Sequence, residues 1–209
     1  MASDRIKSDD FSVLETDAST AARRLLGCIL EREIDGQTAQ LKIVETEAYD
    51  QTDAASHSYN GRTQRVETMF GPAGRAYVYF TYGMHYCCNI VAGDEGFGAG
   101  VLIRAVEPLT NASLLEVRRK GKTGIDVTNG PAKLCQALGI DLNMNGHDLS
   151  KPPLRLIIQP ELPESDIVAT TRIGISKAKE VLWRFYIQDN PFVSVKVPAV
   201  KLLAKGSNR

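Results

Sequence analysis

Hydrophobic and polar positions along the chain mark a succession of short strands with few helices. The strand-like runs are apolar or alternate with a period of two, and turn residues bound several of them. They cover residues 28–34, 39–48, 76–91, 100–107, 154–159, 167–175 and 182–187. Helix-forming runs with capping or stop residues cover 17–26, 114–122 and 131–138. Successive strands joined by hairpins predict a single α+β domain with a mixed, mainly antiparallel sheet and peripheral helices.

The run YVYFTYGMHYCCNIV, residues 77–91, is unusual at its turn. Its first strand alternates phenolic and apolar side chains, so we expect one face in the core and the face of Tyr79 either at the sheet surface or in a site. Tyr82 and Met84 flank Gly83 at the turn, where polar residues are usual. Large exposed side chains at a hairpin tip suit insertion into a partner, and a wedge between DNA base steps is one such use.

Composition and charge limit the possible classes of protein. A chain of 209 residues with 43% hydrophobic content fits one domain with an ample core, residues 1–209, with flexible termini expected at 1–9 and 199–209. Lys and Arg number 25 and Asp and Glu number 25. That balance is far from the basic composition typical of nucleic-acid-binding domains, so any DNA contact needs a local basic face.

Several features predict an intracellular protein without a membrane anchor. No apolar run approaches the roughly 20 residues that span a bilayer. The first residues lead into charged positions and lack the apolar core of a signal peptide. The four scattered cysteines fit neither a zinc ribbon nor a secreted disulfide scaffold, so we interpret them as reduced and structural.

The run IVETEAY carries two carboxylates and a phenol on one strand face. Glu45, Glu47 and Tyr49 alternate with apolar neighbours, and together they could form an acid–base site. The alternative is a solvated outer face with cross-strand ion pairs to Arg32 or Lys42. Periodicity does not choose between Glu45 and Glu47 as the functional carboxylate.

Arg104 interrupts the apolar strand 101–106. A buried arginine needs an acidic or hydrogen-bonding partner, because an unpaired buried charge costs roughly several kcal/mol. Arg104 is therefore a candidate partner for a carboxylate across the sheet. The alternative is an arginine on an edge strand that reaches solvent.

Metal and cofactor motifs are not found in the sequence. His57, His85 and His147 are widely spaced and have no HExxH or CxxC companion, so no metal site is expected. No glycine-rich phosphate loop, GxSxG elbow or dinucleotide-binding fingerprint occurs either, and no cofactor is expected.

Seven segments in collinear order together resemble the alkyladenine (3-methyladenine) DNA glycosylase family of the human and bacterial type. The resemblance covers residues from about Asp10 to Val195. The segments are IVETEAY (43–49), AASHS (54–58), MFGPAGRAYVYFTYGMHYCCNIV (69–91), VLIRAVEP (101–108), NGPAKLCQALGI (129–140), RIGI (172–175) and RFYIQDNPFVSV (184–195). The resemblance implies a single-domain, metal-free, monofunctional enzyme that flips a damaged nucleotide out of duplex DNA and hydrolyses its N-glycosidic bond.

The catalytic residues implied by the resemblance are Glu47 and Arg104. Glu47 would be the general base that deprotonates the attacking water, which decides between the two glutamates of the strand. Arg104, together with the backbone near Ile173, would hold that water. None of the matched positions is a lysine, so simple hydrolysis is favoured over a covalent Schiff-base route.

The resemblance also assigns a base pocket to five residues. Tyr49, His57, Tyr79 and Ile173 would surround the flipped base, and Asn89 would obstruct the amino group of undamaged guanine. Alkylated purines such as 3-methyladenine and 7-methylguanine are cationic, so stacking between the two tyrosines adds a cation–π attraction of roughly 0.5–2 kcal/mol. Hypoxanthine, a deaminated purine, is a further candidate substrate.

The implied partner is double-stranded DNA that contains damaged purines, bound by a monomer. Tyr82 would enter the duplex from a protruding hairpin where the nucleotide has left, with Met84 and His85 beside it. In a bacterium the protein would act in the cytoplasm and nucleoid. Two other classes compete with this hypothesis, a binding module that uses the hairpin without catalysis and a hydrolase of small nucleosides. Glu47 and Arg104 argue against the first, and the exposed wedge argues against the second.

Overall fold

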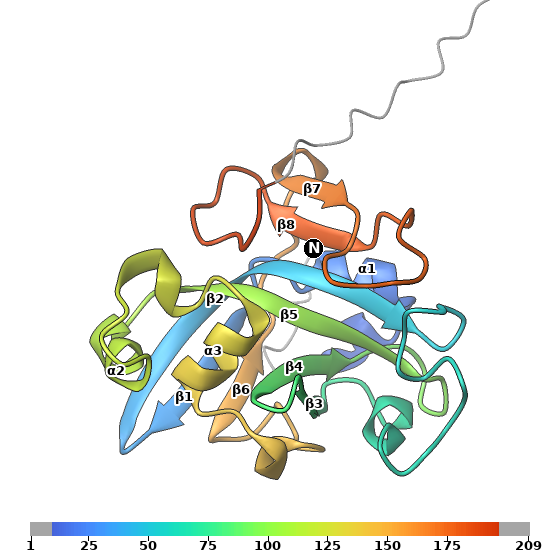
Figure 1. Cartoon of the computed structure of the whole chain (residues 1–209), viewed down its shortest axis with the longest axis horizontal. Helices are drawn as coiled ribbons and strands as arrows, with labels where there is room; N and C mark the ends of the chain where they lie inside the picture. Colours follow the sequence, from blue (N-terminus) through green and yellow to red (C-terminus); the bar gives the residue numbers. More distant parts are fainter. Residues whose placement is uncertain (1–9, 197–209) are drawn as a thin grey trace, which may run out of the picture.

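The longest strand, β2 (Gln37–Asp50), lies at the centre of an eight-stranded curled sheet in the computed structural model, which describes residues 10–196 (Figure 1). The main path runs in the order β3 (Ala76–Thr81), β4 (His85–Val91), β5 (Ala99–Pro108), β2, β1 (Ile29–Ile34) and β6 (Leu154–Ile157). A branch leaves β2 through β8 (Arg184–Ile187), which pairs in turn with β7 (Ile167–Thr170). Every pairing between these strands is antiparallel. The predicted single α+β domain with a mainly antiparallel sheet is confirmed.

Strand β2 changes its neighbour halfway along its length. One edge pairs with β1 over residues 37–42 and then with β8 over residues 45–47. The other edge pairs with β5, and two register shifts interrupt this ladder. The shifts leave Val44 on β2 and Arg104 on β5 without opposite partners. Such bulges bend the strands and redirect side chains, and here they lie beside both glutamates of β2.

Helices α1 (Ala18–Arg24) and α3 (Pro131–Leu138) both pack against the sheet. Figure 1 shows α1 behind β2 and α3 in front of the sheet. The side chain of Asp17 caps α1 by accepting a hydrogen bond from the backbone N–H of Thr20 at 3.0 Å. Helix α3 packs on β4, on β5 and on α2 (Ala112–Arg118). The 3₁₀ helices of the described residues are η1 (Phe11–Leu14), η2 (Glu67–Phe70), η3 (Gly124–Val127), η4 (Leu142–Met144) and η5 (Glu164–Asp166).

The buried core joins the helices to the sheet. One large apolar cluster contains the inner faces of α1 and α3 together with residues from β1 to β6 and β8. All four cysteines are buried and free, as predicted. Phe80 is a correction, because it was expected in the core but is 44% exposed and packs on the ring of Tyr86 with centroids 5.1 Å apart.

Two predicted elements end early. The strand expected over 167–175 stops at Thr170, and the chain then forms a loop that reaches β8. Arg172 accounts for the early end of this strand, because its buried guanidinium forms an ion pair with Asp53 in the loop after β2. The helix expected at 114–122 begins and ends earlier, at Ala112 and Arg118.

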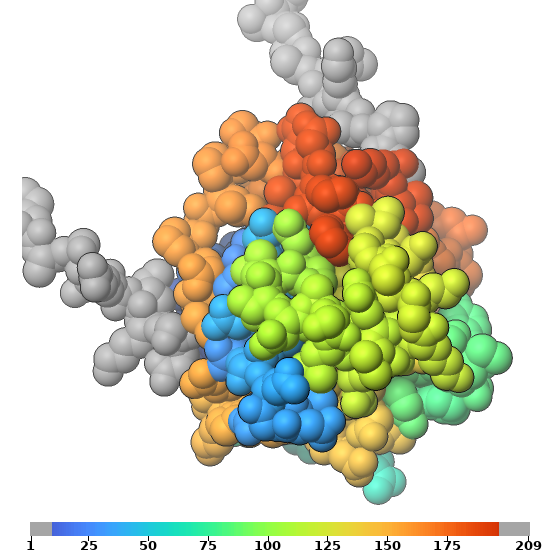
Figure 2. Space-filling view, turned by 90° about the vertical axis from the view of Figure 1, so that its left-hand side faces the viewer, coloured from blue at the N-terminus to red at the C-terminus, as the bar shows by residue number. Residues whose placement is uncertain are grey.

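The segment after β8, residues 188–196, lies on the outside of the sheet near the end of β5. Figure 2 shows this segment (red) directly against the green and yellow-green residues that follow β5 and form α2. Asn190 Nδ2 donates a hydrogen bond to Glu107 Oε2 at 2.9 Å. The expected flexibility of residues 1–9 and 199–209 concerns positions outside the described residues. Within 10–196, no helix combines the length and the apolar content needed to cross a bilayer.

Candidate active site

A cavity of about 480 Å³ opens beside the start of α3. Its walls come from β2 and the loop after it, η2, the β3–β4 hairpin, β5, the start of α3 and the loop between β7 and β8. Eight of the ten residues predicted to form the site line this one cavity: Glu47, Tyr49, His57, Tyr79, Tyr82, Asn89, Arg104 and Ile173. The other two, Met84 and His85, are exposed at and beside the hairpin turn, outside the cavity.

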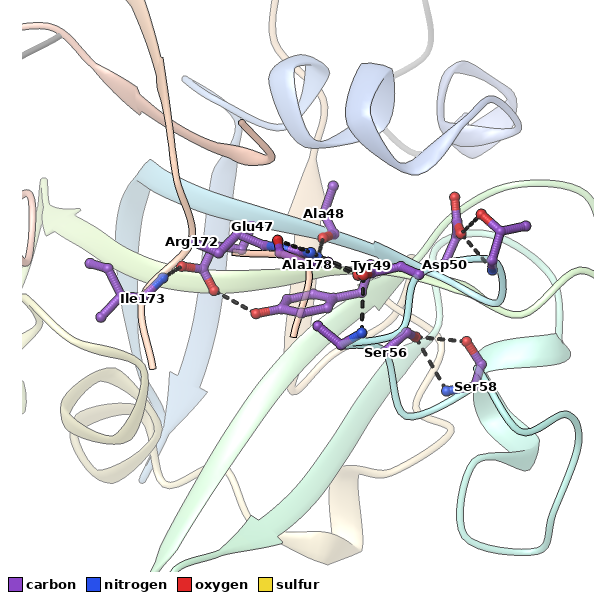
Figure 3. Close-up of polar contacts among 12 residues, drawn as sticks. Glu47, Ala48, Tyr49, Asp50, Ser56, Ser58, Arg172, Ile173 and Ala178 are labelled. Carbon is purple, nitrogen blue, oxygen red and sulfur yellow. Dashed lines mark hydrogen bonds and ion pairs between the residues drawn. The ribbon is translucent and has the colours of Figure 1, made fainter. Parts of the chain in front are cut away.

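Glu47 lies fully buried at the wall of the cavity, with three donors directed at its carboxylate. The backbone N–H of Ile173 donates to Oε1 at 2.7 Å, and Nη1 of Arg104 lies 3.2 Å from the same oxygen. Oε2 accepts a hydrogen bond from the Tyr49 hydroxyl at 2.7 Å (Figure 3). A carboxylate offers about four acceptor positions. Among the described residues, one acceptor position on Oε2 is therefore left open.

The alternative of a solvated outer face for the two glutamates is wrong. Both Glu45 and Glu47 are fully buried. Ile173 and Arg104 contact the Glu47 carboxylate, whereas Arg184 and Ser194 contact that of Glu45. Arg32 and Lys42, the cations expected to pair with these glutamates in that alternative, have other partners. Arg32 donates to the carbonyl oxygen of Leu138 at 2.7 Å, and Lys42 forms its ion pair with a glutamate of β5.

Arg104 is buried and does not reach solvent, so its predicted pairing with a carboxylate is confirmed. Its Nε donates to Glu45 Oε1 at 3.0 Å while Nη1 faces Glu47. Burial by itself would lower the pKa of Arg104, but the charges of Glu47 and Glu45 outweigh it and raise the pKa above its ordinary value. The guanidinium is therefore a permanent cation beside the candidate base.

A second buried arginine, Arg172, packs against the ring of Tyr49. The guanidinium carbon of Arg172 lies 4.6 Å from the Tyr49 ring centroid, and its Nη1 donates to the carbonyl oxygen of Ala48 at 2.8 Å (Figure 3). Asp53 pairs with the same guanidinium, with 3.0 Å between Nη2 and Oδ1. Burial, reinforced by the nearby charge of Glu47, raises the pKa of Tyr49, so its hydroxyl stays protonated and donates.

The opposite wall of the cavity is aromatic. The rings of His57 and Tyr79 meet edge to face with centroids 4.5 Å apart. His57 Nδ1 lies 3.1 Å from the Tyr77 hydroxyl, and Asn89 Nδ2 donates to the Tyr77 carbonyl oxygen at 3.1 Å. Burial raises the pKa of Tyr77 to about 12. Burial lowers the pKa of His57, and the charge of Arg65 lowers it further, so the imidazole is neutral at pH 7.

The tip of the β3–β4 hairpin presents large side chains on a strained turn. Tyr82 and Gly83 both have positive φ, 51° and 68°, and the N–H of Met84 donates to the Thr81 carbonyl oxygen at 3.2 Å. These features define a type I′ turn. Glycine adopts its left-handed backbone without strain, whereas a residue with a side chain costs roughly 1–2 kcal/mol of conformational free energy there. Tyr82 is 81% exposed and Met84 is 70% exposed. Folding stability therefore does not explain a tyrosine at this position.

Several residues of the cavity wall were not predicted as site residues, among them Tyr77, Cys87 and Lys177. Tyr77 shares a strand face with Tyr79, so the period of two could have found it, and Cys87 lies directly opposite Tyr79 in the β3–β4 register. Lys177 lines the cavity from the loop between β7 and β8, which has no periodic signal. Among residues 10–196, no three His, Cys, Asp or Glu side chains come together in a way that could hold a metal ion.

Comparison of the sequence with known proteins shows the family of the chain. The family described as "Methylpurine-DNA glycosylase (MPG)" matches residues 12–191. Three relatives share the name "Putative 3-methyladenine DNA glycosylase". The relative from Carboxydothermus hydrogenoformans is 51% identical over 86% of this chain and 95% of its own. Those from Methanoculleus marisnigri and Francisella tularensis are each 46% identical, over 86% and 88% of this chain and 95% and 97% of their own. The chain belongs to the methylpurine-DNA glycosylase family, a family of DNA N-glycosylases.

Proposed function

We propose that the protein removes damaged purines from double-stranded DNA by hydrolysing their N-glycosidic bonds. The substrates are 3-methyladenine, 7-methylguanine and hypoxanthine, each flipped out of the duplex into the cavity by a monomeric enzyme. The observation that carries the proposal is the single open acceptor position on Glu47 Oε2 at an aromatic cavity. The names of the relatives support the same activity.

The proposed reaction needs one water molecule beside Glu47. The water oxygen attacks C1′ of the deoxyribose, its proton passes to the Glu47 carboxylate, and the base leaves with the electron pair of the broken C1′–N bond. Glu47 is fully buried but lines the cavity, so the attacking water reaches Oε2 from the cavity side. A general base of this kind contributes about 10²–10⁴-fold to the rate. Arg104 and the Ile173 N–H fix the carboxylate so that Oε2 faces the water.

The aromatic walls suit an alkylated purine. A cationic base between Tyr49 and Tyr79 gains a cation–π attraction of roughly 0.5–2 kcal/mol. Neutral His57 does not repel that charge. Asn89 lines the cavity and is fixed by its hydrogen bond to the Tyr77 carbonyl oxygen, and we infer that it obstructs the amino group of an undamaged guanine. The pocket thus combines attraction for damaged purines with exclusion of a normal one.

The exposed hairpin tip supplies the means of flipping. We infer that Tyr82 enters the duplex through the minor groove and occupies the space of the extruded nucleotide, with Met84 and His85 against the neighbouring bases. Wedges of this kind unstack a base step, and the cost of unstacking is lowest for damaged or mispaired bases. The left-handed backbone at Tyr82 and Gly83 holds the tyrosine ring clear of the sheet.

Lys177 supports a second candidate, a covalent route. An amine at the cavity wall could attack C1′ of the abasic product and form a Schiff base, which leads to strand cleavage. We favour hydrolysis because Glu47 is fixed at the cavity wall with an open acceptor position, whereas Lys177 is exposed. Borohydride added during turnover distinguishes the two routes. Hydrolysis predicts no trapped protein–DNA adduct, and an adduct that is lost in Lys177→Ala would establish the covalent route.

Release of free base is the direct test of the proposed function. Duplexes that contain 3-methyladenine, 7-methylguanine or hypoxanthine are incubated with the native protein, and the liberated bases are separated and quantified. The proposal predicts release from duplex DNA and none from the corresponding free nucleosides. Binding of damaged duplex without release would favour a binding module, whereas release from free nucleosides would favour a small-nucleoside hydrolase.

A further inference from the structure

A second buried carboxylate, Glu45, lies two residues before Glu47 and outside the cavity wall. Four donors from three segments converge on it. Oε1 accepts from Arg104 Nε at 3.0 Å, from Arg184 Nε at 2.7 Å and from the Ser194 hydroxyl at 2.9 Å. Oε2 accepts from the Ser194 backbone N–H at 2.6 Å. So many donors on one buried group indicate a site where the position of charge is tightly fixed.

The charges alternate along a buried chain that runs from Arg184 through Glu45 and Arg104 to Glu47. Two cations face two anions, so the chain is neutral as a whole. Arg104 divides its guanidinium between the two carboxylates, with Nε on Glu45 and Nη1 toward Glu47. An arginine that is free to turn prefers to grip one carboxylate with two parallel N–H groups. Glu45 is the group that keeps Arg104 from doing so to Glu47.

We propose that Glu45 is a positioning residue for the reaction proposed above, acting on Glu47 through Arg104. By engaging Nε, Glu45 restricts Arg104 to a single contact with Oε1 of Glu47 and leaves Oε2 open for the water. Without the Glu45 charge, Arg104 turns, binds both oxygens of Glu47 and blocks the base. This inference rests on the proposed function, since it assigns a task within that reaction.

Ser194 and Val195, near the end of the described residues, also contact this chain of charges. Ser194 contributes two of the four donors to Glu45, and an Arg184 N–H donates to the carbonyl oxygen of Val195. Figure 2 shows the segment after β8 against residues from the middle of the chain. Ser194 and Val195 thus contact the end of the charge chain formed by Arg184 and Glu45, which lies outside the cavity wall.

A double-mutant cycle between Glu45 and Arg104 tests the proposal. Single-turnover base release and affinity for damaged duplex are measured for native protein, Glu45→Gln, Arg104→Gln and the double variant. We expect Glu45→Gln to slow release by about 10- to 100-fold with affinity unchanged, and to have no further effect in the Arg104→Gln background. An equal loss in both backgrounds, or a loss of affinity in step with rate, would overturn the positioning role. Native protein that releases no base would instead contradict the proposed function itself.

Ser194→Ala gives a second test that keeps every charge in place, in case Glu45→Gln does not fold. It removes one neutral donor to Glu45, and we expect slower release by about 2- to 10-fold. Ser194→Thr retains the hydroxyl and restores the native rate. Ser150→Ala is the matched control, because the Ser150 hydroxyl donates to Asp148 at 2.7 Å, away from the charge chain. A Ser194→Ala rate equal to those of Ser150→Ala and native protein would contradict the inference.

Discussion

The guanidinium of Arg172 lies against one face of the Tyr49 ring, with 4.6 Å from its carbon to the ring centroid. Asp53 neutralises this arginine from the opposite side, and both partners are buried. The pair therefore serves two purposes. It fixes the ring that forms one wall of the cavity, and it anchors the loop whose Ile173 N–H contacts Glu47.

Loss of Asp53 should strongly destabilise the fold. Asp53→Ala leaves the Arg172 charge buried without its partner, and breaking a buried pair in this way costs about 3–5 kcal/mol of unfolding free energy. Urea denaturation measures the change. Asp126→Ala is the control, because it removes an exposed pair with Lys133, 3.3 Å apart, that contributes about 0–1 kcal/mol. Equal midpoints for the two variants would show that the buried pair does not stabilise the loop.

The hairpin tip should matter for DNA and not for folding. In Tyr82→Asn the turn is kept, since asparagine suits type I′ positions, but the aromatic ring is lost. We expect affinity for damaged duplex to fall by about 1–3 kcal/mol, the value of stacking one base on an aromatic ring. Unfolding free energy should not fall, because the side chain is 81% exposed and asparagine suits the left-handed backbone at this position.

Val117→Asn on α2 is the matched control for the hairpin variant. Val117 is 78% exposed and does not line the cavity, so neither DNA affinity nor stability should change. If Tyr82→Asn binds damaged duplex as tightly as Val117→Asn, the wedge role is wrong.

His57 should make binding of cationic bases sensitive to acid. Burial and the charge of Arg65 hold the pKa of His57 below its ordinary value, so the ring is neutral at pH 7 and gains its proton only below about pH 6.5. A charged ring then repels a cationic purine. In a Glu47→Gln background, which prevents base release during the measurement, affinity for 7-methylguanine duplex should weaken as the pH falls through this range. Affinity for hypoxanthine duplex should not weaken.

His57→Asn provides the control for the pH dependence. Asparagine does not titrate, so the acid-induced loss of affinity for 7-methylguanine should disappear. An identical pH profile with and without His57 would assign the effect to another group.

Local sequence patterns predict much of the fold and less of the site. Alternation over β1 to β5 is a local property, so the hairpins and the antiparallel sheet can be derived from it. Burial of Glu45 and Glu47 is not local, because Ile173 contacts Glu47 from 126 positions away and Ser194 contacts Glu45 from 149 positions away. The same holds for Lys177, which an irregular loop brings to the cavity.

The bulges at Val44 and Arg104 mark a further limit of pattern analysis. A period of two assumes an unbroken ladder, but the register shifts twice beside the glutamates. The shift directs Arg104 between both carboxylates, which strand alternation alone does not predict. The resemblance to a family could select Glu47, but the position of its partners had to come from the structure.

We propose that Glu47 activates the water that breaks the glycosidic bond. The most direct test of this role is single-turnover release of 7-methylguanine or hypoxanthine from duplex DNA by native protein and by Glu47→Gln, with affinity for the same duplexes measured alongside. The isosteric amide keeps the shape of the site but cannot accept the proton from water. We predict a rate lower by about 10²–10⁴-fold with duplex affinity retained. Release by Glu47→Gln at the native rate would contradict the account.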